Sequence, residues 1–235
     1  MALTKYVDGP TMTALCIEES ISYMFNHIGW EGFIRKKCPT YHKLTLEFLS
    51  SLTYGPNLGM WLNRGRASFR LFGFTYQRTT RKISDLLGFP NGLDAFTVAQ
   101  EDLFMDIELD YFLIQIFFQH NYDRNQMQFT QINNPVICYF HMILAFTFFG
   151  KEQNNTLGSR DELFIMFCVF QYRTLNGEAF MLANLHDIAR ASHGPILIGG
   201  LVSMIATYLS LRTPLSHLKP LGGYFLMDNV IRWKN

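Results

Sequence analysis

Apolar residues recur at steps of three and four through most of the chain, the spacing that places them on one face of an α-helix. The clearest stretch follows Pro39 and has its apolar positions at Tyr41, Leu44, Phe48, Leu49 and Leu52. The polar residues between them, His42, Lys43 and Glu47, fall on the predicted solvent face. A similar face in residues 12–27 predicts a helix that ends near Gly29.

Further helices are indicated by residues that satisfy the unpaired N–H and C=O groups of helix ends. Asn134 and Pro135 form a cap and first position ahead of the apolar run 136–149. Ser159 and Glu162 have the capping-box spacing ahead of residues 163–172. The same kind of signal predicts helices over 178–191, after Asn176-Gly177, and over 196–211, after Pro195, while residues around 101–119 also have a helical pattern.

One short stretch, residues 68–77, has the alternation of a strand instead. Phe69 and Leu71 precede Gly73, and Phe74 and Tyr76 follow it, which predicts a β-hairpin. Thr79 or Thr80 then caps a short helix with Ile83, Leu86 and Leu87 on its buried face and with Gly88 and Pro90 at its end. The predicted fold class is therefore mainly α, a single multi-helix domain with a small β-hairpin near residues 68–77.

Composition supports a folded chain with a thick aromatic core. Of the 235 residues, 49% are hydrophobic, 15% are aromatic and only 17% are charged, against about 25% charged in an average soluble domain. These proportions exclude a disordered chain. The net charge of +1 provides no overall attraction to nucleic acid or to anionic lipid.

The amino terminus and the cysteines indicate an intracellular protein, without distinguishing nucleus from cytoplasm. Residues 1–10 contain no apolar run of a secretory signal, and the four cysteines form no C-x-x-C pair. The uncharged stretch between Arg190 and Arg212 approaches the length that spans a bilayer. Because it contains several Gly and Ser residues and Pro195, we interpret it as a buried helix and expect no membrane span.

Charge is sorted along the middle of the chain. Residues 61–82 carry six basic residues and no acid, and residues 83–123 carry eight acids and no base. The basic run predicts a candidate nucleic-acid contact with aromatic residues interleaved, made by Arg64, Arg66, Arg70, Arg78, Arg81 and Lys82. The alternative, which we favour, is that the two runs face each other or are ordinary solvated surfaces, so that nucleic-acid binding is weak or absent.

The usual catalytic and cofactor motifs are missing. The sequence has no G-x-G-x-x-G, no P-loop and no G-x-S-x-G. His186 and His193 lack a third metal ligand, and Asp102, Asp106 and Asp110 fit a solvent-facing acidic stripe better than a cation site. We therefore assign no catalytic, cofactor-binding or metal-binding residue and expect no cofactor and no enzyme activity.

Several segments, in this order, resemble the first-open-reading-frame protein of Athila-type plant retrotransposons, in the region called its C-terminal domain. They are Gly29-Trp30, residues 39–51, 69–73, 83–90 and 132–141, Asn176-Gly177 with Phe180, residues 198–201, and Ile205-Ala206. The resemblance spans most of residues 29–211. It differs at Cys138, where the pattern has an arginine ahead of Tyr139-Phe140-His141. It implies a helical domain over 29–211, with a helical extension at 1–28 and a tail at 212–235.

The resemblance also implies a function. Proteins of this kind are encoded by Ty3/Gypsy elements and are treated as gag-like, with no established catalytic residues to carry over. We therefore expect a non-enzymatic structural or interaction protein of a retrotransposon, whose candidate partners are a second copy or a host protein. The alternative is a transposon-derived host nuclear factor of the plant-mobile-domain type, acting in silencing, which genomic flanks without long terminal repeats would favour.

Overall fold

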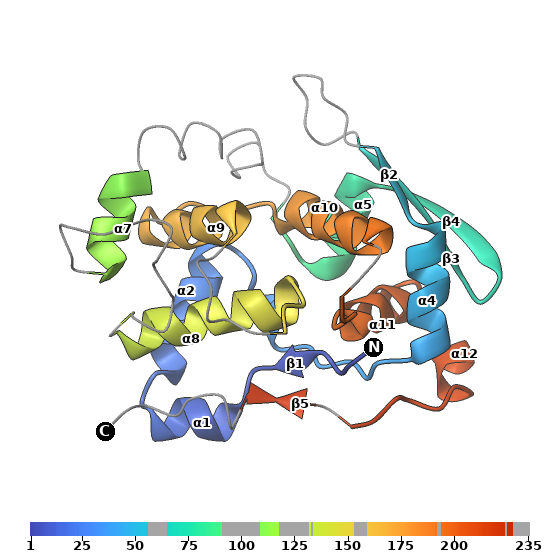
Figure 1. The fold of residues 1–235 in the computed structure, drawn as a ribbon, viewed down its shortest axis with the longest axis horizontal. Helices are drawn as coiled ribbons and strands as arrows, with labels where there is room; N and C mark the ends of the chain where they lie inside the picture. The colour runs from blue at the N-terminus through green and yellow to red at the C-terminus, as the bar shows by residue number, and fades with distance from the viewer. Residues whose placement is uncertain are drawn as a thin grey trace.

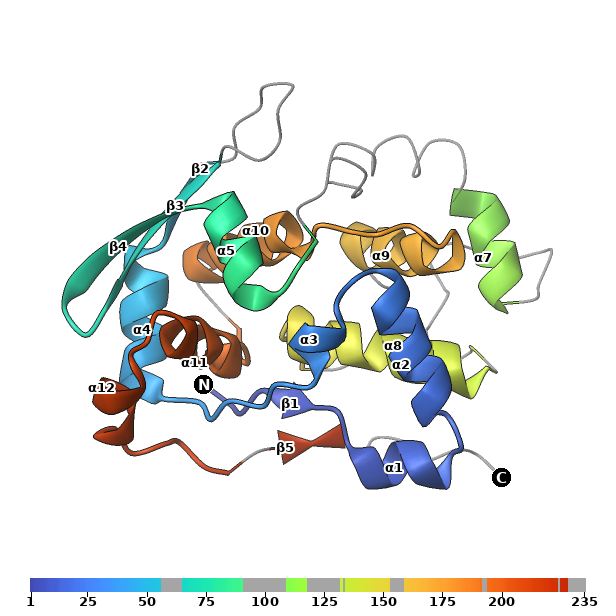
Figure 2. The same cartoon turned by 180° about the vertical axis from the view of Figure 1, so that it is seen from behind.

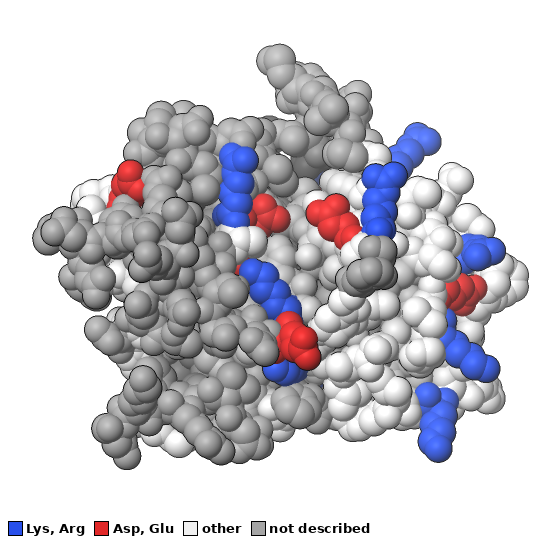
Figure 3. All heavy atoms as spheres, viewed as in Figure 1, with Lys and Arg blue, Asp and Glu red and all other residues white. Residues whose placement is uncertain are grey.

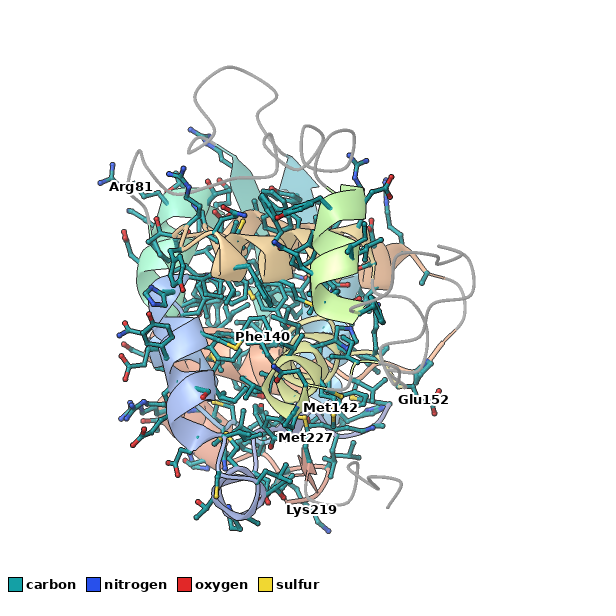
Figure 4. The ribbon with its side chains drawn as sticks, turned by 90° about the vertical axis from the view of Figure 1, so that its left-hand side faces the viewer. Arg81, Phe140, Met142, Glu152, Lys219 and Met227 are labelled. Carbon is teal, nitrogen blue, oxygen red and sulfur yellow. The ribbon has the colours of Figure 1, made fainter. Side chains whose placement is uncertain are left out.

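The structure is a computed structural model, and it describes residues 1–55, 65–90, 109–117, 132, 134–152, 159–191, 194–223 and 225–227. Helix α8, Pro135–Ile143, runs through the middle of the molecule and continues as a π-helical turn over Leu144–Phe148. The side chain of Asn134 caps α8 by accepting from the N–H groups of Val136 and Ile137. Phe140 is fully buried and lies at the centre of the view in Figure 4.

Helices α2, Glu18–His27, and α9, Arg160–Phe170, pack along α8, and α7, Leu109–Phe117, stands beside α9 (Figure 1). The short helix α3, Glu31–Ile34, brings Trp30 into an aromatic cluster. The Trp30 ring stacks on Phe148 at 4.8 Å and also touches Phe33 and Phe89. Its Nε1 donates to the carbonyl of Leu175, 2.8 Å away, so the one polar atom of the ring is satisfied.

The other side of the molecule is built around α4, His42–Ser51, and a three-stranded antiparallel sheet. Strands β2, Thr53–Gly55, β3, Arg66–Leu71, and β4, Phe74–Thr79, lie in the order β2-β3-β4. Phe48 of α4 packs on Phe69 of β3 with ring centroids 4.8 Å apart. Helices α5, Thr80–Leu87, α10, Gly177–Arg190, and α11, Gly199–Tyr208, pack against this unit, and α12, Arg212–Ser216, follows α11 (Figure 2).

Both ends of the chain meet in one small parallel pair. Strand β1, Lys5–Tyr6, pairs with β5, Phe225–Leu226, and the two lie side by side in both ribbon views. Helix α1, Gly9–Ala14, follows β1. Tyr6 approaches Gly200 so closely that a Cβ at that glycine would overlap the tyrosine hydroxyl. Met12 and Met227 belong to the common core, although the proposed boundaries at 28/29 and 211/212 stay predictions.

The predicted fold class is confirmed, since the protein is mainly helical with one small antiparallel sheet. The caps at Asn134, Ser159 and Asn176 are confirmed, as is the left-handed Gly88 that ends α5. Among the described residues, no helix is long and apolar enough to cross a membrane.

Several boundaries differ from the prediction. The expected helix over 12–27 is two helices, because Cys16 takes a left-handed conformation with φ 54°. The helix expected from 196 begins at Gly199. The Ile196 carbonyl and the Gly200 N–H, which would bond each other in a helix from 196, bond instead to the Ala2 N–H and to Thr4 Oγ1. The hairpin is longer than predicted and gains a third strand, β2. Leu86 was expected to be buried but is only half-buried.

Candidate functional site

The β3–β4 hairpin, which carries three of the six predicted basic residues, turns at Phe72-Gly73. Both residues have positive φ, 55° and 79°, as a two-residue hairpin turn requires. Glu47 of α4, expected on the solvent face, instead accepts from the Phe72 N–H at 2.8 Å and the Gly73 N–H at 2.6 Å. Ser51 Oγ accepts from the Arg70 N–H at 2.8 Å. Two side chains of α4 therefore fix the position of the hairpin.

The register of the hairpin separates its arginines. Arg66 pairs with Thr79 and Arg70 with Thr75, so both arginines share the exposed face of β3 opposite Phe69. Arg78 pairs with Ala67 and lies on the other face of the sheet, with its guanidinium 5.7 Å from the Tyr76 ring. Arg64 lies outside the described residues.

The last two predicted basic residues, Arg81 and Lys82, are exposed on the first turn of α5. Arg81 extends from the periphery of the molecule in Figure 4. Figure 3, viewed from one side, shows Lys and Arg side chains set apart along the edge that carries the sheet and α4, with an acidic side chain and uncharged surface between them. The described basic residues thus occupy separate faces, and nucleic-acid contact by the run as a whole stays a prediction. Of the eight acids expected to face them, only Asp85 and Asp110 are described.

The start of α9 contains the first of two buried glutamates. Glu162 is 0% exposed, and its Oε2 accepts from the Ser159 N–H and from Lys151 Nζ, each at 2.5 Å. His141 Nε2 of α8 lies 3.8 Å from Glu162 Oε1. Burial alone would raise the pKa of Glu162, but His141 and Lys151 outweigh it and hold that pKa below its ordinary value. Burial lowers the pKa of His141, so we assign an ionised Glu162 beside a neutral imidazole.

The start of α10 contains the second. Glu178 is 2% exposed, and its Oε2 lies 3.2 Å from Ser84 Oγ of α5. Ser84 Oγ lies at the same distance from Asn176 Oδ1, which also accepts from the Glu178 N–H as the cap of α10. Burial raises the pKa of Glu178 to about 7, despite the opposing hydrogen bond from Ser84. Within the described part of the chain, the Glu178 carboxyl has a hydroxyl and no cation as a hydrogen-bond or ion-pair partner to stabilise its charge.

The sequence did not predict either of the clusters around Glu162 and Glu178. Ser159-x-x-Glu162 predicted the cap but gave no sign of Lys151 or His141, and Asn176-Gly177 gave no sign of Ser84. Acids in the first turn of a helix are common on exposed surfaces, so their position alone does not reveal burial.

The described part of the chain does not bring the other candidate metal-binding or nucleophilic residues together in a site. Asp102, Asp106 and His193 lie outside the described residues, and His186 faces the Tyr54 ring at 6.4 Å. Within the described ranges, no three His, Cys, Asp or Glu residues gather as a metal site would require. Burial raises the pKa of the Cys138 thiol to about 11 and that of Cys168 further, so neither is a ready nucleophile.

Comparison with protein families places these features in context. The ATHILA ORF-1 family matches residues 1–203, which is most of the chain. The chain belongs to the ATHILA ORF-1 family. It is thus a plant retrotransposon-encoded protein, and the resemblance to Athila-type first-open-reading-frame proteins is confirmed. Comparison with curated proteins and with solved structures gave no match.

The family match extends over α1 and α2 as well as the segments that carried the resemblance. It includes the α4 and hairpin unit and the starts of both α9 and α10, so Glu47, Glu162 and Glu178 all lie inside the matched region. These carboxylates therefore belong to the family part of the chain.

Proposed function

We propose that this retrotransposon-encoded protein is a gag-like structural protein that acts by binding other molecules, first of all a second copy of itself, and not by catalysis. The observation that carries the proposal is an exposed aromatic surface. Tyr23 is 57% exposed and Tyr172 is 66% exposed, on either side of His27. Aromatic side chains in contact with water are enriched where proteins meet.

The geometry of this surface supports a fixed contact area. The His27 ring lies 4.1 Å from the Tyr23 ring and 4.8 Å from the Tyr172 ring, and both pairs are nearly perpendicular. The three rings border a cavity of about 340 Å³ at the junction of α2, α8 and α9. Rings held by one another lose little conformational entropy on binding, which favours association.

The buried carboxylates support the non-enzymatic part of the proposal. Glu162 and Glu178 have the most altered environments among the described acids, and such groups are the first candidates for acid–base catalysis. Both are almost without exposure. The Glu162 carboxylate accepts from the Ser159 N–H at the start of α9, and the Glu178 carboxyl faces the Ser84 hydroxyl of α5. Their positions are accounted for by folding.

Sedimentation velocity of the full chain over a concentration series tests the proposal. We expect reversible association, and we expect Tyr23→Ser combined with Tyr172→Ser to abolish it. Phe74→Ser is the matched control, because Phe74 is 69% exposed but lies on the hairpin. A chain that stays monomeric at every concentration would overturn self-association, and association unchanged in the double variant would overturn the assigned surface.

A further inference from the structure

A surface cavity of about 370 Å³ lies between the β4–α5 junction and the carboxyl end of α11. Figure 2 shows these elements together on the side of the molecule away from the viewer of Figure 1. Its wall combines two cations, Arg78 and Lys82, with one acid, Asp85. Tyr208 and Ser210, at the end of α11, also line it. Leu86 and Leu209 complete it, which also explains why Leu86 is only half-buried.

Arg78 and Lys82 both have donor groups that could bind an anion. Arg78 donates one Nη1 hydrogen bond to the carbonyl of Gln77 at 2.9 Å, which leaves the rest of its donor fork. Lys82 is exposed, and within the described ranges neither cation takes part in an ion pair. Arg78 lies near the end of β4, and Lys82 lies on the first turn of α5, which follows β4 directly. Two cations in the lining of one cavity suit a compact multivalent anion.

The hydroxyl of Tyr208 is the second observation. Its Oη is buried and has no hydrogen-bond partner among the described residues, an arrangement that costs free energy unless a ligand or water satisfies it. The ammonium of Lys36 lies 4.4 Å from the centre of the Tyr208 ring and adds positive charge nearby. Ser210, exposed and left-handed with φ 63°, adds a hydroxyl at the rim.

We propose that this cavity binds the phosphate group of a nucleotide unit. A phosphate accepts hydrogen bonds only, and the lining of the cavity contains a guanidinium and an ammonium, with the unpartnered phenol O–H of Tyr208 buried behind it. The leucines provide an apolar contact for the attached nucleoside. The carboxylate of Asp85 opposes the anion, so the net charge of the lining is +1, from two cations and one acid.

This site is narrower than the predicted basic run. Arg66 and Arg70 lie on the opposite face of the sheet and take no part. A single strand held at one or two phosphates has a shallow salt dependence, with a log–log slope of about −0.7 to −1.4. Weak binding overall and a defined phosphate site are therefore compatible.

Binding is measured on the full chain by calorimetry and by anisotropy of a labelled oligouridylate, with inorganic phosphate and adenosine 5′-monophosphate as further ligands. We expect Arg78→Gln and Lys82→Gln each to weaken binding about tenfold, the loss of one charge-assisted hydrogen bond. Tyr208→Phe weakens it less and leaves the volume of the side chain unchanged. Asp85→Asn strengthens it, since the repulsive charge is removed.

Arg70→Gln is the matched control, because Arg70 is an exposed arginine of the same hairpin outside the cavity. Thermal unfolding of each variant separates lost binding from lost folding. Competition by the mononucleotide indicates a free nucleotide as ligand, and binding of the oligouridylate alone indicates a strand; both support the phosphate site. No binding of any phosphate ligand, or equal loss with Arg70→Gln, overturns it.

Discussion

Helices α9 and α10 both begin with a buried glutamate just after their caps, yet the two carboxyls are in opposite states. Glu162 of α9 has Lys151 at 2.5 Å and is ionised, whereas the Glu178 carboxyl of α10 has the Ser84 hydroxyl as its hydrogen-bond partner among the described residues. Burial raises the pKa in both places, and the neighbouring His141 and Lys151 together reverse the result at Glu162. The difference teaches that partner charge, more than depth, sets the state of a buried acid here.

The difference also has a structural origin. Lys151 follows the π-helical turn and Gly150, and it remains 30% exposed while reaching the buried carboxylate. The ammonium thus keeps some water and does not bear the full cost of burial. At α10 the equivalent space is occupied by α5, which presents the small hydroxyl of Ser84.

The largest expected effect follows from removing the cation at α9. Lys151→Met leaves the Glu162 charge buried beside a neutral imidazole, and we expect a loss of about 3 kcal/mol in the free energy of unfolding. The double variant Lys151→Met/Glu162→Gln should recover most of this loss, since glutamine still completes the cap. Denaturant unfolding of the single and double variants measures the coupling.

The control for that cycle is an exposed pair. Arg35, just after α3, has its Nη2 2.6 Å from Oε1 of Glu31, the first residue of α3. The two side chains are 69% and 45% exposed. We expect Arg35→Met to cost less than about 1 kcal/mol. Equal losses from Lys151→Met and Arg35→Met would contradict the distinction between a buried and an exposed pair.

The second prediction concerns pH at α10. Because the pKa of Glu178 is raised to about 7 in the folded chain, its contribution to stability is present below its ordinary pKa of 4.5 and is lost as pH rises through about 7. Relative to Glu178→Gln, we expect wild-type stability to fall by about 2 kcal/mol between roughly pH 5 and pH 8. Unfolding free energies at several pH values measure this window.

The comparison of the wild type with Glu162→Gln should show the opposite dependence of stability on pH. The pKa of Glu162 is lowered, so its contribution is present at neutral pH and is lost as pH falls through that lowered pKa. The wild type should therefore exceed Glu162→Gln at neutral pH, and the two should converge in acid. The same pH trend in both comparisons would contradict the assignment of opposite states.

Much of the fold could be predicted from the sequence because its signals are local. The caps at Asn134 and Ser159 and the left-handed Gly88 depend on neighbouring residues, so the helices after the caps and the end of α5 were placed correctly. The break at Cys16 was missed because no Gly or Pro marks it, although its hydrogen bonds are local, from the Cys16 N–H to Thr13 and from the Ile17 N–H to Met12. The start of α11 was missed because it depends on a distant partner, Thr4.

The candidate sites were harder to predict from the sequence, because they depend on contacts between distant segments. The basic run is visible in sequence, but which arginines share a face depends on the register of β3 and β4. The period of three and four placed Glu47 on the solvent side of α4, and only the fold brings the hairpin turn to its carboxylate. Lys151 and Ser84 meet their glutamates through packing of separate helices, which no spacing within one segment encodes.

The smallest expected effect tests the hydroxyl at α10. Ser84 has one hydrogen and faces two acceptors at 3.2 Å, Asn176 Oδ1 and Glu178 Oε2. A protonated Glu178 removes the conflict, because it donates to Ser84 Oγ and leaves the serine hydrogen for Asn176. Ser84→Ala should cost about 1 kcal/mol at acidic pH.

The direction of the pKa change makes this test specific. Among the described residues, the Ser84 hydroxyl is the group that stabilises the ionised form of Glu178, and its hydrogen bond lowers the pKa against the effect of burial. Ser84→Ala should therefore raise the pKa of Glu178 above its value in the wild type and move the loss of stability to higher pH. Ser50→Ala is the control, because the exposed Ser50 hydroxyl donates only to the Glu47 carbonyl of its own helix. A Glu178 pKa that falls in Ser84→Ala would mean that a different donor, and not the serine, holds the ionised form.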